Sequence, residues 1–190
     1  MSYGVILLRA QPFHMGHMSV IQKILKENEK ALIVIGSANK DHTKRNPFPV
    51  ETREKWIRKV LQEELSMDKV KILRLCDWSA EDAYKFKKEW GKFFYYNVCN
   101  AIQGKYFTLY YNDDPEIAKS WFSEEIANRV QVKSVPRIDH ISATEVRKAI
   151  EDHDTEYLKK ALHPCMQDPG TIKRMSLFLK SAVKDDFIME

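Results

Sequence analysis

Residues 3–17, YGVILLRAQPFHMGH, are predicted to form a strand, a loop and the start of a helix in direct succession. Tyr3–Leu8 is a continuous apolar run rich in branched side chains, which is typical of a strand buried on both faces of a parallel sheet. A helix is predicted to begin near Gly16, because apolar residues then recur at helical spacing, at Met18, Ile21, Ile24 and Leu25. A buried strand that leads through a loop into a helix is the first unit of an α/β fold.

Further buried strands follow at intervals along the chain. They are predicted over residues 31–35, 70–75, 106–111 and 130–135. Helical patterns lie between them, so strands and helices alternate. This alternation predicts an α/β fold built on a doubly wound, parallel, five-stranded sheet with right-handed crossovers.

The helices predicted between the strands include residues 51–65 and 80–102, and more helices follow the last strand. No repeat or linker divides the sequence. We expect one domain over residues 1–190, with a core of residues 3–150 and a C-terminal helical segment of residues 151–190.

The composition is that of an ordinary globular protein, with 44% apolar and 31% charged residues. The formal net charge of +4 comes without a long run of lysines or arginines, which argues against nucleic acid as a partner. The three cysteines lie far apart, so we expect neither a disulfide framework nor a metal site built by the protein.

The sequence also bears on where the protein acts. It starts without a basic leader, and no apolar stretch approaches the ~20 residues that span a bilayer. We therefore expect a cytoplasmic protein that does not bind membranes. Whether the chain assembles into a homo-oligomer stays open.

The loop after the first strand carries the first candidate site. His14 and His17 stand at a predicted helix start, where free backbone N–H groups attract phosphate. Both imidazoles can donate hydrogen bonds to phosphoryl oxygens as negative charge develops. Gly16 would let the backbone approach a ligand, and Arg9 adds a guanidinium suited to phosphate.

A second candidate site follows the last strand, in the segment ISATEVR at residues 141–147. Ser142 followed by Glu145 predicts a helix start with a capping box. Capping accounts for both residues, but it does not account for Arg147, which follows at a second anion-binding position. Ligands bind beyond the carboxyl ends of strands in such sheets, so the two segments are expected to meet.

Together these segments resemble the nucleotidyltransferase superfamily with HxGH and ISxTxxR signatures. His14, Met15, Gly16 and His17 match the first signature, and residues 141–147 match the second, with Ala143 where glycine is common. Within the superfamily, residues 9–17, residues 35–48 with Arg53 just beyond, and residues 141–148 resemble archaeal-type nicotinamide-nucleotide adenylyltransferases. The resemblance implies a Rossmann-like nucleotidyltransferase fold.

The resemblance also implies a reaction, in which ATP and nicotinamide mononucleotide give NAD and pyrophosphate without a covalent intermediate. The implied catalytic residues are His14, His17, Arg45 and Arg147. The implied nucleotide-binding residues are Arg9, Gly16, Ser142, Thr144 and Asn112. Mg²⁺ would be bound through the triphosphate rather than in a protein cage.

The acceptor half of the site matches the family less completely. Asp77 matches its acceptor-binding aspartate, while Trp90 lies further along the chain than the tryptophan that stacks on the nicotinamide ring. Trp78 is an alternative stacking residue, and Trp90 also suits a core stripe with Phe94. The family's glycine before Asn112 is replaced by a tyrosine, and its glycine before Arg9 by a leucine.

These departures leave two other functions open. One is adenylyl or cytidylyl transfer to another phosphorylated acceptor, such as phosphopantetheine or a polyol phosphate. The other is a non-catalytic nucleotide-binding regulator. Both functions keep the nucleotide half of the site. They differ from the reaction above in the acceptor, which is another molecule in the first and is not used in the second.

Overall fold

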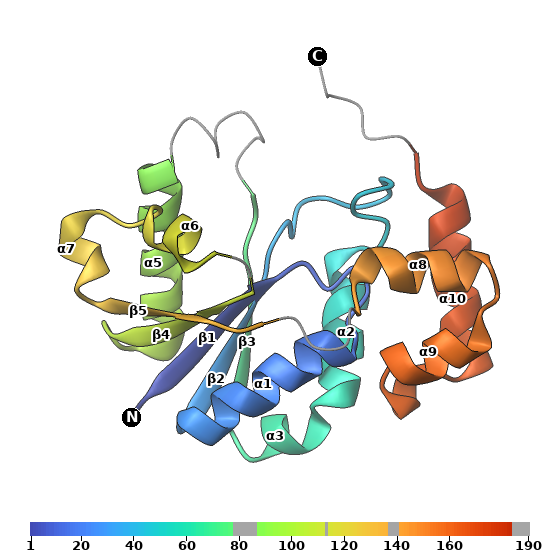
Figure 1. Ribbon diagram of the computed structural model, residues 1–190, viewed down its shortest axis with the longest axis horizontal. Coiled ribbons are helices and arrows are strands. Elements are labelled where there is room, and N and C mark those ends of the chain that lie inside the picture. The colour runs from blue at the N-terminus through green and yellow to red at the C-terminus, as the bar shows by residue number, and fades with distance from the viewer. Residues whose placement is uncertain (78–86, 113, 137–140, 184–190) are drawn as a thin grey trace.

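The computed structural model describes residues 1–77, 87–112, 114–136 and 141–183, which form a parallel five-stranded sheet with helices on both faces (Figure 1). The strand order is β3-β2-β1-β4-β5, and every pair is parallel. The strands are β1 (Tyr3–Leu8), β2 (Lys30–Ile35), β3 (Val70–Arg74), β4 (Phe107–Tyr111) and β5 (Val130–Ser134). The predicted doubly wound sheet is confirmed, with each strand within a residue or so of its expected bounds.

The helices connect the strands and extend beyond β5. They are α1 (Met15–Glu27), α2 (Val50–Val60), α3 (Gln62–Ser66), α5 (Lys87–Ile102), α6 (Pro115–Lys119), α7 (Glu124–Ala127), α8 (Ala143–Glu151), α9 (Thr155–Ala161), the 3-10 turn η1 (Pro164–Met166) and α10 (Pro169–Ser181). In the described part of the chain, none of them has the length and apolar character needed to cross a bilayer.

The helix predicted over residues 51–65 is in fact two helices, α2 and α3. Leu61 separates them with backbone angles of φ −107° and ψ 31°, while its side chain is fully buried. The apolar spacing is continuous across this junction, so periodicity alone could not reveal the break. Trp78 and the first part of the helix predicted over residues 80–102 lie outside the described residues.

Alternating side chains of the strands fill two separate cores. In β2, Ile33 and Ile35 face a core shared with α1, α2 and the C-terminal helices α8, α9 and α10. Leu32 and Val34 face the opposite core, shared with α5, α6 and α7. Because a strand buried on both faces must be apolar at every position, β2 reads as a continuous hydrophobic run.

The central strand β1 is where the connections change direction. It pairs with β2 on one side and with β4 on the other. At its carboxyl end, the carbonyl of Leu8 accepts a hydrogen bond from the N–H of Gly36, at 2.9 Å. The loops after β1 and β2 therefore leave the sheet side by side, at the edge where open α/β sheets bind ligands.

Candidate active site

The two histidines of the first motif are held together at the start of α1. His14 is the N-cap residue, and its backbone N–H donates to Nδ1 of His17 at 3.3 Å. Their rings stack with centroids 3.6 Å apart. A β-carbon at Gly16 would lie 3.0 Å from the His14 ring. Gly16 therefore makes room for this imidazole, and close approach of a ligand to its backbone stays a prediction.

The surroundings of His17 keep its imidazole neutral. Burial and the neighbouring His14 hold the pKa of His17 well below its usual range, with burial as the larger cause. Since Nδ1 accepts the His14 N–H, the proton of the neutral ring belongs on Nε2. His17 is thus arranged as a neutral hydrogen-bond donor.

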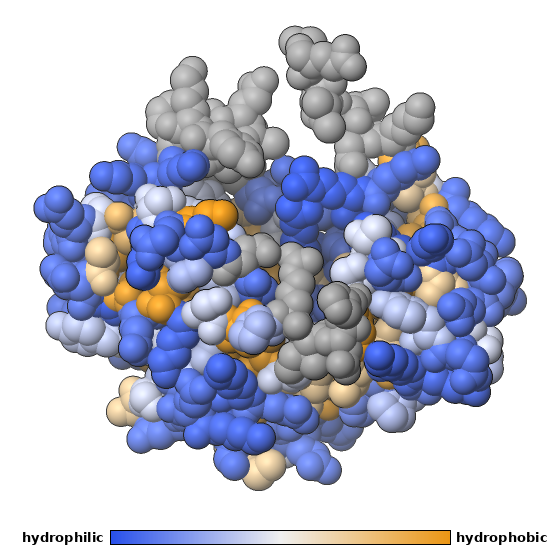
Figure 2. Space-filling model, viewed as in Figure 1, coloured by the Kyte–Doolittle hydropathy of each residue, from blue (hydrophilic) through white to orange (hydrophobic). Residues whose placement is uncertain are grey.

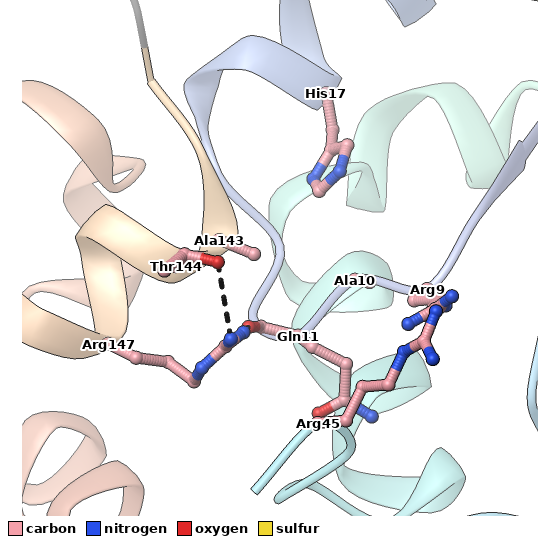
Figure 3. A pocket seen from close by; sticks show the side chains of 8 residues that line it. All are labelled: Arg9, Ala10, Gln11, His17, Arg45, Ala143, Thr144 and Arg147. Carbon is pink, nitrogen blue, oxygen red and sulfur yellow. Dashed lines mark hydrogen bonds between the residues drawn. The ribbon is translucent and has the colours of Figure 1, made fainter. Parts of the chain in front are cut away.

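His17 and three arginines line an open cavity of about 280 Å³ (Figure 3). The arginines come from three segments: Arg9 follows β1, Arg45 lies in the loop after β2, and Arg147 projects from α8. Among the described residues, the complete lining is Arg9, Ala10, Gln11, His17, Arg45, Ala143, Thr144 and Arg147. The part of the lining that the structure describes has three guanidinium groups and no carboxylate, which suits a polyanion.

The cationic lining belongs to a polar surface. On the face shown in Figure 2, hydrophilic residues dominate over the loop that joins β2 to α2 and over α8. The loop and the helix carry Arg45 and Arg147, respectively. Arg45 is exposed and Arg147 is half-buried, so an anionic ligand can reach both from solvent.

Arg147 joins α8 to the loop after β1. Its Nη1 donates to the carbonyl of Gln11 at 2.7 Å, and its Nη2 donates to Oγ1 of Thr144 at 3.3 Å (Figure 3). Burial lowers the pKa of Arg147, the nearby Arg9 lowers it further, and Glu151 opposes both. The two predicted motifs therefore meet in space, as the positions of their strands required.

Ser142 precedes α8 and Asn112 follows β4, and neither is among the residues that line the cavity. The Oγ of Ser142 accepts a hydrogen bond from the N–H of Glu145 at 3.1 Å, which caps α8. Asn112 follows β4, and its Oδ1 is buried with no hydrogen-bond partner among the described residues. Direct contact of either residue with a nucleotide stays a prediction.

Arg53, on α2, is a buried cation that the sequence did not identify as part of the site. Its side chain is fully buried, with Nη1 donating to the carbonyls of Arg9 (2.8 Å) and Gly36 (2.9 Å) and Nη2 to that of Ser37 (2.9 Å). Burial lowers its pKa to about 10. The available signal was a charged residue on the apolar face of a helix, next to Trp56 and Ile57 in the helical repeat.

Gln11 is a second residue that the sequence analysis missed. Its side-chain amide pairs with the backbone of Phe48, donating from Nε2 to the carbonyl at 3.1 Å and accepting the N–H at 2.9 Å. This pair joins the loop after β1 to the end of the loop that carries Arg45. Gln11 is also part of the cavity lining, and a glutamine between Ala10 and Pro12 was the signal for it.

Asp77 lies just beyond the carboxyl end of β3, beside the chain that leaves β2. Its carboxylate accepts hydrogen bonds from the N–H of Ser37 at 3.2 Å and from the Oγ of Ser37 at 2.5 Å. Nζ of Lys40 lies 3.7 Å from it. Asp77 does not line the arginine cavity, and its contact with an acceptor stays a prediction.

Trp90 lies at the start of α5 in an aromatic cluster. Its ring stacks on Phe94 with centroids 5.5 Å apart, and it meets Trp121 edge-on at 4.9 Å. The core stripe that the spacing indicated is therefore observed. A stacking role toward an acceptor stays a prediction for Trp90.

Among the described residues, no three or more histidine, cysteine, aspartate or glutamate side chains are grouped so that they could hold a metal ion. The chemistry of the cavity lining instead suits a cation that arrives already bound to phosphate oxygens.

Comparison with known families places the chain by sequence. The family described as Cytidylyltransferase-like matches residues 9–149, which include both histidines and Arg147. This protein belongs to that family.

The most similar relatives include archaeal proteins named nicotinamide-nucleotide adenylyltransferase. That of Archaeoglobus fulgidus is 28% identical over 88% of this chain and 91% of its own, and that of Thermococcus sibiricus 25% identical over 96% and 92%. A third, from Thermoplasma volcanium, is 45% identical over 30% of this chain and 32% of its own.

Solved structures share the fold. A bifunctional NMN adenylyltransferase/ADP ribose pyrophosphatase from Francisella tularensis, complexed with AMP and a manganese ion, aligns with a TM-score of 0.69 at 23% identity. The alignment covers 94% of this chain and 49% of that one, so the present chain spans about half the length of the bifunctional enzyme.

Proposed function

We propose that this protein transfers the adenylyl group of ATP to nicotinamide mononucleotide, giving NAD and pyrophosphate. The cavity that joins Arg9, Arg45 and Arg147 to the neutral imidazole of His17 carries this proposal. The archaeal relatives that align over nearly the whole chain support the choice of reaction. The protein is a transferase of the nucleotidyl class.

The triphosphate of ATP would lie against the arginines. Each guanidinium can form two parallel hydrogen bonds to phosphate oxygens, and the three come from separate segments, with Arg9 and Arg45 together and Arg147 apart from them in Figure 3. Because Arg147 is already fixed by the Gln11 carbonyl and by Thr144, it needs little reordering to bind. The cavity is preorganised for a chain of phosphates.

The reaction would be a direct displacement. A phosphate oxygen of the mononucleotide attacks the α-phosphorus of ATP and forms a new P–O bond. The bond from the α-phosphorus to the oxygen bridging to the β-phosphorus breaks, and pyrophosphate leaves with that electron pair. The Nε2–H of His17 donates to oxygens whose negative charge grows in this step, and the arginines offset the charge of the leaving group.

A divalent cation, Mg²⁺ under cellular conditions, would accompany the triphosphate. The lining fits a metal-bound triphosphate because its arginines, His17, Gln11 and Thr144 can face phosphate oxygens but include no carboxylate that would ligate the metal. When bound, the cation supplies charge neutralisation and orients the phosphates. Its ligands would be phosphate oxygens and water.

The acceptor would lie toward the ends of β3 and β4. Asp77 closes β3 with a fixed carboxylate, and Trp90 is part of an aromatic cluster at the start of α5. An indole offers a flat face to a pyridinium ring, and a carboxylate favours its positive charge. We assign both residues to the acceptor half of the site.

The reaction is tested directly with purified protein. We expect ATP, nicotinamide mononucleotide and Mg²⁺ to give NAD and pyrophosphate in equal amounts, measured by chromatography and by a coupled pyrophosphate assay. Parallel arms replace ATP with CTP, and the mononucleotide with phosphopantetheine or a polyol phosphate. Faster pyrophosphate release with another acceptor would overturn the acceptor assignment. Binding of ATP without turnover in any arm would identify a regulator.

The acceptor half of the site is tested by two substitutions. We expect Asp77→Ala and Trp90→Ala each to raise the KM for nicotinamide mononucleotide about tenfold, a loss of about 1.4 kcal/mol, with the KM for ATP little changed. Steady-state kinetics with both substrates titrated measure this split. Asp77→Asn is the matched control, because it keeps the shape and removes the charge.

Trp90 needs a stability control, because its ring packs on Phe94 and Trp121. Denaturant unfolding of Trp90→Ala separates packing from binding. A loss of about 3–5 kcal/mol in the free energy of unfolding, with an unchanged KM for the mononucleotide, would mean that the ring only packs. Trp90→Phe keeps an aromatic ring in the cluster and should recover most of that stability.

A further inference from the structure

The loop that carries Arg45 is held at its far end by Gln11. The two hydrogen bonds between the Gln11 amide and the backbone of Phe48 fix the chain three residues beyond Arg45. Within the loop, the N–H of Asn46 donates to Oγ1 of Thr43 at 3.0 Å, which closes a short turn around Arg45. These contacts hold the end of the loop and the turn around Arg45. They do not hold the chain that enters the turn at His42.

Val183, two residues beyond the end of α10, holds the chain that enters the turn. The N–H of Val183 donates to the carbonyl of His42 at 2.9 Å, and the carbonyl of Val183 accepts from the N–H of Lys44 at 2.9 Å. These bonds form an isolated parallel bridge between Thr43 and Val183. The side chain of Val183 is 60% exposed, so its backbone makes the connection. Figure 1 shows the end of α10 rising beside this loop.

Phe178, in the last turn of α10 and five residues before Val183, supports the same loop. Its ring lies 5.9 Å from the His42 ring and 6.0 Å from the Phe48 ring, measured between centroids. α10 itself is fixed to the core by the fully buried Met175, and it packs against α8. One helix therefore contacts both the Arg45 loop and the helix that presents Arg147.

Such support matters because the cavity gathers like charges. Arg9 lies close enough to Arg147 to influence its ionisation, and Arg45 lines the same cavity. Repulsion among these cations favours conformations in which a surface loop moves outward. A loop anchored on both sides of Arg45 resists that movement and keeps the guanidinium where a phosphate will need it.

We propose that Val183 and Phe178 are positioning residues, through which the C-terminal helix holds Arg45 against Arg9 and Arg147 and sets the affinity for the triphosphate. This inference rests on the proposed function for the identity of the ligand. It assigns a role in substrate binding to a helix whose own side chains do not line the cavity.

The test uses Val183→Pro, which removes the N–H that donates to His42. We expect its affinity for inorganic tripolyphosphate and for Mg²⁺-ATP to fall about tenfold, measured by calorimetry, with the KM for the acceptor unchanged. Val183→Ala is the matched control, because it keeps the backbone donor and should bind like the wild type. Wild-type affinity in the proline variant would overturn the inference.

A double-mutant cycle shows whether the effect passes through Arg45. In an Arg45→Ala background, Val183→Pro should cause little further loss of affinity, because the group it positions is gone. A full tenfold loss in that background would overturn the inference. If Val183→Pro fails to fold, Phe178→Leu, which keeps the apolar packing and removes the ring contacts, gives the same comparison.

The tripolyphosphate arm also separates this inference from the proposed function. Binding of tripolyphosphate needs neither an acceptor nor turnover. A wild-type protein that binds it but makes no NAD would contradict the proposed reaction, while the comparison of variants would still test the role of α10.

Discussion

Replacement of His17 with alanine is expected to lower kcat by ~10²–10³ while the affinity for ATP changes little. In the proposed reaction the neutral imidazole would donate from Nε2 to oxygens that become more negative only as the new P–O bond forms, so its contribution would be largest in the transition state. Steady-state turnover and calorimetric titration of ATP measure the two quantities separately.

Two further variants distinguish the hydrogen bond from the local structure. His17→Asn keeps an acceptor for the backbone N–H of His14 but has no group near the position of Nε2, so it should fold normally and remain slow. His17→Gln returns a donor near that position and should recover part of the rate. A His17→Ala variant within about threefold of wild-type turnover would exclude a catalytic role, since tenfold corresponds to only about 1.4 kcal/mol.

Replacement of Arg53 with methionine is expected to reduce the free energy of unfolding by about 3 kcal/mol or more. The three carbonyls of Arg9, Gly36 and Ser37 lose their donor, and an unsatisfied buried acceptor costs about 1–3 kcal/mol. Methionine fills much of the same volume, so the loss reports hydrogen bonding more than packing. Equilibrium denaturation with urea measures it.

Arg53→Lys is the matched control for charge. Its single ammonium cannot reach all the carbonyls that the two guanidinium nitrogens reach, so it should fall between the wild type and Arg53→Met. If Arg53→Met lost less than about 1 kcal/mol, the carbonyls would have found water or another donor, and the bond network would not be what holds the two loops.

The architecture could be predicted because local patterns of apolar residues indicate each strand and helix. The apolar runs of β1 and β2 are continuous, and a strand covered on both faces leaves no choice in its composition. The meeting of His17 and Arg147 followed from topology, since loops at the carboxyl ends of parallel strands share one edge.

The parts of the site that the sequence analysis did not predict are long-range contacts to backbone groups. Arg53 binds carbonyls, Gln11 binds the backbone of Phe48, and Val183 binds the backbone of His42 and Lys44. A backbone group leaves no mark on the identity of the residue that carries it, so no sequence pattern points to these pairs. Trp90 differs, because its contacts are between rings: its partner Phe94 follows from helical spacing, while Trp121 comes from a separate segment that spacing does not indicate.

The bond between Arg147 and the carbonyl of Gln11 joins residues 136 positions apart in the chain. An unfolded chain cannot hold the two motifs together, so a triphosphate can bind in this way only to the native state. By mass action, a ligand present at about 100 times its dissociation constant then adds about 2.7 kcal/mol to the free energy of unfolding. The nucleotide supply of the cell would in this way help to set what fraction of the protein is folded.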